Sequence, residues 1–294
     1  MTIPFRFGVV SAQQPHGSSW TDHARRVERL GYDVLLMPDN VSHGLAVFPA
    51  LAAAATATSR LRVGSYVLAN DTRHPVQVAK EALALAVLSG GRFELGLGAG
   101  RPDSGRDNAM LGLRFDDPGV RVSRLIDSVS IIKRLLAGGT VDHESPYYSI
   151  TGASIVPWGI EPPDVRFLLA ASAPRMITHA AREADIIALG VPPETTEAAV
   201  QDRVELLRTQ ADGRPIEVNV NLMAIGDVVP RYLAGRIDTE ALAKAGAISV
   251  VSGGPAEIAD QLRERRERIG INYVVVGDEL MDAFAPVVQL LTGS

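Results

Sequence analysis

The sequence predicts an α/β protein with a single (β/α)₈ TIM barrel over residues 1–294, carrying insertions after strand four and strand seven. Short apolar runs alternate with helical patterns along the chain, which indicates strands that are each followed by a helix. A barrel typically needs about 250 residues, so this length leaves room for two insertions. A doubly wound open sheet is the rival fold, but the first strand ends in Ser11-Ala12-Gln13-Gln14-Pro15, which is no phosphate loop.

Each expected strand is a short apolar run that ends at a turn signal. In chain order, the expected strands are Phe5–Val10, Val34–Met37, Leu61–Leu68, Phe93–Leu97, Arg166–Ala170, Asp185–Leu189, Ile216–Ile225 and Tyr273–Val276.

Each expected helix has apolar residues about one turn apart, or a terminus marked by serine, proline or glycine. In chain order, the expected helices are Ser19–Leu30, Pro49–Thr58, Val76–Leu88, Val120–Leu136, Pro174–Glu183, Thr195–Gln210, Pro255–Arg268 and Asp282–Leu291. The two insertions are residues 139–164, where Thr140–Ile150 predicts a hairpin, and residues 227–253, which we expect to be helical in part.

Composition excludes several classes of protein. With 46% hydrophobic and 21% charged residues the chain is globular rather than disordered, and a net charge of −5 argues against general nucleic-acid binding. The absence of cysteine excludes disulfides, thiolate metal sites and cysteine nucleophiles. No apolar run approaches about 18 residues, and the N-terminal segment has no basic n-region. We therefore expect a soluble cytoplasmic protein without a membrane span or signal peptide.

No metal site is expected, because the histidines lack ligand spacing and the strand ends lack clustered carboxylates. His23 and His179 lie on expected helices, where we expect them to face solvent.

The active site of a barrel lies at the carboxyl ends of its strands. Strand two is followed by Asp39, Asn40 and His43. A carboxylate there can bind a cofactor or move protons, or it can cap the next turn. After strand three, Thr72-Arg73-His74-Pro75 is typical of a helix start, so His74 is expected to be structural.

The exits of strands four and five are rich in small residues. Strand four ends in Gly96-Leu97-Gly98-Ala99-Gly100-Arg101, which lets a flat ring or a phosphate approach the backbone and places Arg101 for an anion contact. A plain turn is the alternative. The segment Ala171-Ser172-Ala173-Pro174 opens a helix, so its N–H groups can bind phosphate, or Ser172 can cap the helix.

Three other residues bear on the pocket. Asn219 and Asn221 share one face of strand seven, where they either line the pocket or pair within the core. Trp158, in the first insertion, is interpreted as a packed loop residue rather than a lid.

These segments resemble the bacterial-luciferase-like superfamily of flavin- and deazaflavin-dependent oxidoreductases, and within it the actinobacterial coenzyme F-420-dependent branch. The resemblance covers essentially the whole chain. Its most specific parts are Gly31–Asp33 leading to Met37–Asp39, Leu61–Gly64 through Thr72–Pro75, and Gly91–Gly100.

The resemblance implies roles for the residues after strand two. Asp39 would lie near the cofactor ring and would polarise or protonate the substrate. Deazaflavin members commonly continue with histidine and phenylalanine, where this chain has Asn40 and Val41, and His43 would substitute for the missing histidine.

The resemblance also implies the cofactor contacts. A non-prolyl cis peptide is expected at Tyr66–Val67, under the central ring of the cofactor. The implied phosphate contacts are Gly98, Ala99, Gly100, Arg101, Ser172 and Ala173.

The resulting hypothesis is an enzyme that transfers a hydride between coenzyme F-420 and a small organic substrate. Two alternatives stay open: an FMN-dependent monooxygenase that uses oxygen, and a non-catalytic barrel that binds a flavin. Asp39 and Thr72–Pro75 favour the deazaflavin. The expected partners are a flavin or deazaflavin reductase and a second copy of the chain, which the Ala-rich segment Leu51–Ala57 would contact if it does not pack on its own barrel. Substrate contacts are expected from the two insertions.

Overall fold

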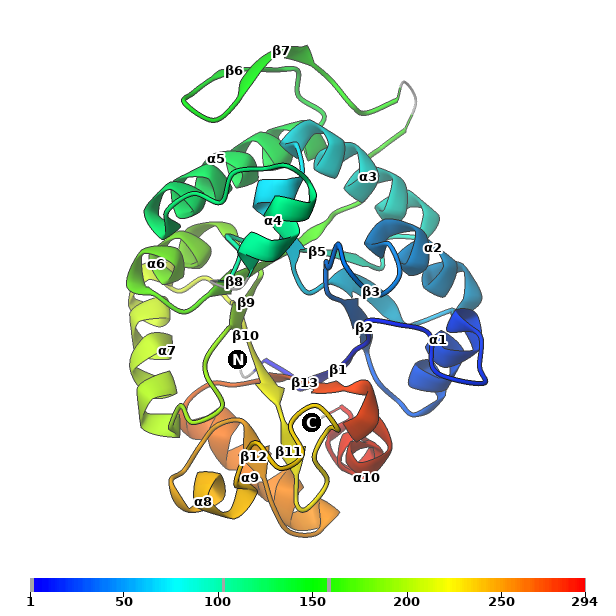
Figure 1. Ribbon diagram of the computed structural model, residues 1–294, viewed down its shortest axis with the longest axis vertical. Helices are drawn as coiled ribbons and strands as arrows, with labels where there is room; N and C mark the ends of the chain where they lie inside the picture. Colours follow the sequence, from blue (N-terminus) through cyan, green and yellow to red (C-terminus); the bar gives the residue numbers. More distant parts are fainter. Residues whose placement is uncertain (1–2, 102–103, 158–159, 294) are drawn as a thin grey trace.

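Parallel strands close into a barrel inside a ring of helices (Figure 1). The computed structural model describes residues 3–101, 104–157 and 160–293, so Trp158 lies outside the described residues. In chain order, the strands of the barrel wall are β1 (Arg6–Val10), β2 (Val34–Met37), β3 (Arg62–Ser65), β5 (Phe93–Gly98), β8 (Arg166–Ala171), β9 (Ile186–Leu189), β10 (Glu217–Leu222) and β13 (Tyr273–Gly277). Each pairs in parallel with its neighbours, and the β3–β5 and β1–β13 pairings complete the circle. The predicted (β/α)₈ barrel is confirmed.

Helices cover the outside of the wall and enclose the main hydrophobic core between themselves and the strands. They are α1 (Trp20–Arg29), α2 (Val47–Ala57), α3 (Pro75–Leu88), α5 (Pro118–Leu136), α6 (Pro174–Glu183), α7 (Glu197–Ala211), α9 (Pro255–Arg268) and α10 (Met281–Leu291). Helices α6 and α9 have the predicted bounds, and α1 follows the Ser19 cap. Helix α2 begins at Val47, two residues before the expected Pro49, and has no side-chain cap. Leu51, Ala54 and Ala55 are buried, so this part of α2 packs on its own barrel. Within the described residues, no helix combines the length and the apolar character that crossing a membrane requires.

Two expected strands are interrupted. The third breaks at Tyr66–Val67, where the peptide bond is cis as expected, and resumes as β4 (Leu68–Ala69) beside β5. The seventh divides into β10 and β11 (Ala224–Ile225), because β11 leaves the wall and pairs with β12 (Val250–Val251) from the second insertion. The continuous apolar run in the sequence does not show this change of partner.

Short helices occupy several strand exits. They are η1 (Asn70–Thr72), α4 (Gly105–Met110), α8 (Thr239–Lys244) and η3 (Asp278–Leu280). The sequence analysis missed α4, a single polar segment too short to show helical periodicity.

The first insertion forms the expected hairpin, but on the outer face of the molecule. Strands β6 (Val141–Glu144) and β7 (Ser149–Ala153) lie outside the ring of helices, beyond α3 and α5 (Figure 1). Ser145 Oγ donates to Asp127 of α5 at 2.6 Å, and the Tyr148 hydroxyl accepts from Asn70 Nδ2 at 3.4 Å. The hairpin therefore braces α5 and η1 from outside the ring of helices, and the expectation that this insertion supplies substrate contacts stays a prediction.

A cluster of charged side chains fills the amino-terminal end of the barrel. Arg6, Arg62 and Arg166 begin β1, β3 and β8, while Glu94 and Glu217 come from β5 and β10. Glu94 pairs with Arg6 and, at 2.6 Å, with Arg62, and Glu217 pairs with Arg6 at 2.5 Å and with Arg166 at 3.0 Å. These contacts join five strands across the interior.

The arginines determine the charge state of Glu94, whose side chain is fully buried. Burial by itself would raise the pKa of this carboxyl group, but the charges of Arg6, Arg62 and Arg166 outweigh it and hold the pKa below its ordinary value. Glu94 is thus an anion inside the barrel, stable there because three cations surround it.

We predict that Glu94→Gln lowers the free energy of unfolding by about 3–5 kcal/mol near neutral pH, because it leaves buried arginines without a counter-charge. Urea unfolding measures this, with the exposed Glu264→Gln as control, expected to change stability by less than about 0.5 kcal/mol. Since the pKa of Glu94 is depressed in the folded state, the stabilisation declines as the pH falls below 4.5, the ordinary carboxyl value, and disappears below the folded pKa. A difference between wild type and variant that persists in acid would contradict this account.

Candidate functional site at the barrel mouth

Asp39 and Arg73 join the exits of the second and third strands. The Arg73 guanidinium donates to both Asp39 oxygens, from Nε at 3.0 Å and from Nη2 at 2.9 Å. The backbone N–H of Ala69 donates to Asp39 Oδ2 at 3.2 Å. The hydrogen bonds to Asp39 raise the pKa of Arg73. The carboxylate is therefore committed to holding residues 69–73 in place, while its expected role toward the substrate stays a prediction.

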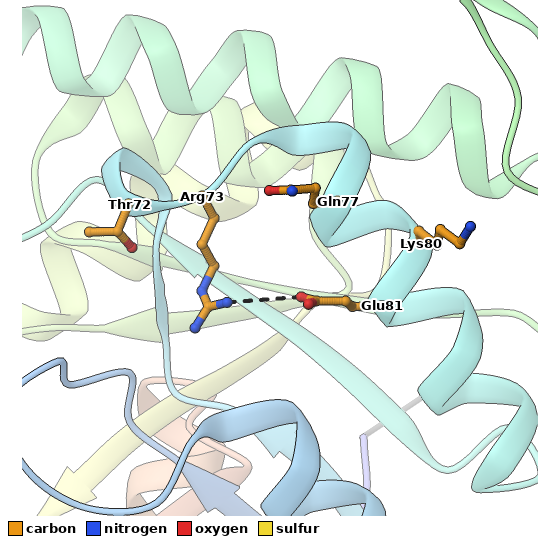
Figure 2. Close-up of a pocket in the computed structure, with 5 residues that line it drawn as sticks. All are labelled: Thr72, Arg73, Gln77, Lys80 and Glu81. Atoms are coloured by element: carbon orange, nitrogen blue, oxygen red, sulfur yellow. Dashed lines mark ion pairs between the residues drawn. The ribbon is translucent and has the colours of Figure 1, made fainter. Parts of the chain in front are cut away.

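A cavity of about 290 Å³ lies on the other side of Arg73 (Figure 2). It is lined by Thr72, Arg73, Gln77, Lys80 and Glu81, on η1 and the first turns of α3. Arg73 Nη1 lies 3.9 Å from Glu81 Oε2, so one guanidinium faces both this carboxylate and Asp39. The lining residues of α3 are exposed, which makes this a surface cavity beside the mouth and not the mouth itself.

The segment after Asp39 forms the rim of the mouth. Asn40 is half-buried and His43 is exposed, with His43 Nδ1 3.0 Å from Ser42 Oγ. Gly44 has a φ of +84°, and a Cβ there would lie 2.3 Å from the Ala12 carbonyl oxygen. This turn presents His43 to solvent at the rim. Asp39, Asn40 and His43 therefore lie on one loop, and within the described residues no hydrogen bond joins their side chains to one another.

Tyr66 and Val67 form part of the floor of the mouth. The Tyr66 side chain packs on the cluster inside the barrel, and its hydroxyl donates to Asn219 Oδ1 on the opposite wall at 2.7 Å. Burial raises the pKa of this hydroxyl, so it remains protonated. Val67 lies against Gly98, where an added Cβ would be 2.7 Å from Val67 Cγ2. The absence of a side chain at Gly98 therefore leaves the space that the Val67 side chain occupies.

Unpaired polar atoms lie beside this floor. Asn219 Nδ2 and Asn221 Oδ1 are buried without a hydrogen-bond partner. The Oδ1 atom of Asn219 thus accepts a hydrogen bond from Tyr66, while its Nδ2 group can still donate one. Asn221 lies two residues further along β10 toward the mouth and offers its side-chain carbonyl oxygen as an acceptor. Buried polar groups without partners are unfavourable, so a bound molecule that pairs with them gains affinity. These groups fit the polar edge of a flavin-like ring or of a substrate.

The exit of β5 offers backbone groups and cationic side chains. Arg121, buried at the start of α5, donates from Nη1 to the carbonyl oxygens of Ala99 and Gly100 at 2.7 and 2.8 Å. Gly100 has a φ of +79°. The Arg101 side chain is exposed, and its backbone N–H donates to Ser104 Oγ at 3.0 Å. Arg121 was missed in the sequence, because a basic residue in a helix gives no sign that it reaches back to a loop.

The exit of β8 leads to an open helix terminus. The N-cap of α6 is Ala173, without a side-chain cap, so the alternative in which Ser172 caps the helix is wrong. Ser172 is exposed, and its carbonyl oxygen accepts from Arg203 Nε at 3.3 Å. Arg175 in the first turn reaches Ser123 Oγ on α5 at 2.8 Å. Pro174 has no N–H, and the Met176 N–H donates to the Ala173 carbonyl oxygen at 3.0 Å, so this terminus offers an anion the Arg175 N–H and the helix dipole. Because β8 lies beside β5, both exits can serve one phosphorylated ligand.

Comparison with known proteins identifies the family of this chain. Residues 1–245 match the family model described as luciferase-like monooxygenase. The chain belongs to this luciferase-like family.

Curated relatives of this luciferase-like chain include two kinds of enzyme. An F-420-dependent glucose-6-phosphate dehydrogenase from Microbacterium testaceum is 32% identical over 53% of this chain and 48% of its own length. A 4-hydroxyprotoasukamycin monooxygenase from Streptomyces nodosus subsp. asukaensis is 36% identical over 43% of this chain and 34% of its own length. The chain therefore spans about half, or less, of the length of these relatives.

A solved structure shows the same fold over nearly the whole length. The coenzyme F-420-dependent tetrahydromethanopterin reductase from Methanopyrus kandleri superposes with a TM-score of 0.75 over 98% of both chains, at 21% identity. At this identity the likeness shows the luciferase-like barrel and no finer property.

A buried polar cluster in this luciferase-like chain was missed in the sequence. Ser11 Oγ donates to Asp278 Oδ2 at 2.7 Å, and His23 Nε2 lies 3.1 Å from both Ser11 Oγ and Asp278 Oδ1. His23 is 2% exposed, so the expectation that it faces solvent is wrong. Its spacing from Trp20 and Val27, both buried, places all three on the inner face of α1. Within the described ranges, no group of three or more histidine, aspartate or glutamate residues is arranged to hold a metal.

We predict that Arg73→Lys lowers the free energy of unfolding by about 1–2 kcal/mol, because lysine keeps the charge but cannot donate to both Asp39 oxygens from a planar fork. Hydrogen exchange should show lost protection at the Ala69 N–H, which donates to the same carboxylate. Lys80→Met, in the same cavity, is the control and should change neither quantity. Unaltered exchange at Ala69 in Arg73→Lys would show that the Asp39–Arg73 ion pair does not hold this segment in place.

Proposed function

We propose that this chain is an oxidoreductase that transfers a hydride between coenzyme F-420 and a small organic substrate. Two curated F-420-dependent relatives, 32% and 34% identical over about half of this chain, support the choice of deazaflavin. The geometry supports a phosphorylated, ring-bearing ligand in general.

The observation that carries the proposal is the pairing of a polar floor with an open anion site at one barrel mouth. Asn219 and Asn221 offer unpaired polar atoms beside Tyr66, and the exits of β5 and β8 offer backbone N–H groups and arginines. The residues that would hold the cofactor are Tyr66, Val67, Gly98, Ala99, Gly100, Arg101, Ser172 and Ala173. When bound, coenzyme F-420 would supply the ring carbon that accepts or donates the hydride.

The side chains after β2 would then divide two tasks. Asp39 would act as a positioning residue, because both of its oxygens already accept hydrogen bonds from Arg73 and Ala69. Hydride removal from an alcohol also releases a proton. His43 would accept it at Nε2, since Nδ1 faces Ser42 Oγ. Asn40 would hydrogen-bond the substrate without taking a proton.

A second candidate is an FMN-dependent monooxygenase that uses oxygen and receives reduced flavin from a partner reductase. The similarity to 4-hydroxyprotoasukamycin monooxygenase, 36% over 132 residues, favours it. The same floor and anion site would serve the phosphate of FMN.

Binding titrations of the purified protein with coenzyme F-420 and with FMN, followed by ring fluorescence, separate the two candidates. We expect coenzyme F-420 to bind and FMN to bind weakly. Tight binding of FMN alone would replace the proposal with the monooxygenase, and binding of neither would overturn both.

We predict that Gly98→Ala weakens cofactor binding roughly tenfold, because the added Cβ displaces Val67 from the floor. Gly190→Ala is the matched control, since it follows β9 and an added Cβ meets no atom within 4 Å, so its affinity should stay within about twofold. Equal affinities for the two variants would place the ring away from Val67. Far-ultraviolet circular dichroism of both variants confirms that the barrel is intact.

A further inference from the structure

A second cavity, of about 510 Å³, lies at the end of the barrel opposite the mouth. Its lining comes from Ile3, the last turn of α7, the turn at residues 211–216 that leads into β10, and residues 266–272, which join α9 to β13. The wall strands begin at this end and finish at the mouth. Its volume is within the roughly 300–1,000 Å³ of cavities that hold small molecules. We call it the basal cavity.

Arg208 lines the basal cavity without an acidic partner. It lies in the last turn of α7, and Gly270, after α9, has a φ of +97°. A Cβ at Gly270 would overlap Arg208 Nη2, so the guanidinium occupies space that only glycine leaves open. Within the described residues, this guanidinium forms no ion pair and no hydrogen bond. Its N–H groups are therefore available to a bound molecule.

Arg214 and Arg266 also line the basal cavity. Arg214 donates from Nη1 to the carbonyl oxygen of Arg182 at 3.2 Å and from Nη2 to the carbonyl oxygen of Ala184. The guanidinium carbon of Arg266 lies 4.1 Å from the centre of the Phe5 ring. Carbonyl oxygens and an aromatic ring are uncharged, so these contacts position the two guanidinium groups without cancelling their charge.

The charge and the surface of the basal cavity define the molecule that fits it. Glu267 is the one carboxylate among the described lining residues, against three arginines, which leaves an excess of two positive charges. A phosphate monoester carries about two negative charges near neutral pH, and guanidinium groups bind its oxygens with paired hydrogen bonds. The wall formed by Leu207, Ile216 and Val218 is apolar. An inorganic ion would leave this wall in contact with water, whereas an apolar body would cover it.

We infer that the basal cavity binds a phosphate monoester with an apolar body, at a site separate from the barrel mouth. The described lining contains no serine, histidine or lysine, so the molecule is bound there and not transformed. Strand β10 connects the two sites, because Val218 lines the cavity while Asn219 and Asn221 lie beside the floor of the mouth. The inference does not depend on which cofactor the mouth binds.

Isothermal titration calorimetry of the full chain tests the inference. The probe is 1-naphthyl phosphate, while 1-naphthol carries only its apolar body and inorganic phosphate only its anion. We expect 1-naphthyl phosphate to bind at least about tenfold more tightly than either, because it alone contacts both the arginines and the apolar wall. Equal affinity for 1-naphthol or for inorganic phosphate would overturn the inference, as would no binding of 1-naphthyl phosphate.

Variants of Arg208 locate the probe. Arg208→Gln should weaken 1-naphthyl phosphate binding on the order of tenfold, and Arg208→Lys should bind with intermediate affinity, because lysine keeps the charge without the planar fork. Arg29→Gln is the matched control, since Arg29 is exposed in the last turn of α1, and its affinity should stay within about twofold. Both changes to glutamine remove a charge that complements a helix dipole. Equal affinities in Arg208→Gln and Arg29→Gln would overturn the inference.

A probe bound at the mouth would respond to a different variant. Arg175→Gln removes a cation beside the exit of β8 and should leave the affinity for 1-naphthyl phosphate within about twofold. A loss of affinity in this variant, with none in Arg208→Gln, would place the probe at the mouth and overturn the inference.

Hydrogen exchange gives an independent location for the probe. Bound 1-naphthyl phosphate should slow exchange in the turn at residues 211–216, where the Arg214 N–H donates to the Ala211 carbonyl oxygen at 3.0 Å. Exchange at residues 98–101, at the mouth, should stay the same. Slower exchange at the mouth alone would contradict a basal site. Arg208 is exposed, so thermal unfolding of Arg208→Gln should match that of the wild type and show that the fold is intact.

Discussion

The charged cluster at the amino-terminal end of the barrel is the constraint on which the remaining structure depends. Closing a parallel sheet leaves an interior that side chains must fill, and this chain fills one end with arginine and glutamate. Glu94 contacts Arg6 and Arg62, and Glu217 contacts Arg6 and Arg166, so the ion pairs cross the barrel and tie β1, β3, β5, β8 and β10 together. Such charges are tolerated inside a protein when each is paired, and the pairing defines which strands face one another.

Because the charged cluster fills the amino-terminal end of the barrel, a ligand can enter the barrel interior only from the opposite end, the mouth. There, the exits of neighbouring strands have different surroundings. Asp39 and Arg73 hold two exits in register, and Tyr66 spans the interior to reach Asn219. The exits of β5 and β8 gather arginines beside the start of α6. Under the proposed function, this cationic stretch would hold the phosphate of the cofactor.

Much of this site was visible in the sequence because it lies in continuous segments. The glycines of β5, the loop after β2 and the turn before α6 are local motifs, and a barrel places them together at one end. The side chains with which these residues pair could not be predicted from the sequence. Asp39 and Arg73 are far apart in sequence, as are Tyr66 and Asn219, and no periodicity reports which side chains meet across a barrel. His23 shows the same limit, because its polar identity predicted exposure while its position on α1 buries it.

By itself, the sequence determined the fold class, the order of strands and helices, most of their bounds and the luciferase-like family. These properties follow from hydrophobic periodicity, caps and short motifs, all of which act over a few residues. Tertiary structure decided the departure of β11 from the wall, the outward position of the β6–β7 hairpin, the ion cluster and the burial of His23. Each depends on contacts between segments distant in sequence, where burial and charge pairing, and not local preference, set the lowest free energy.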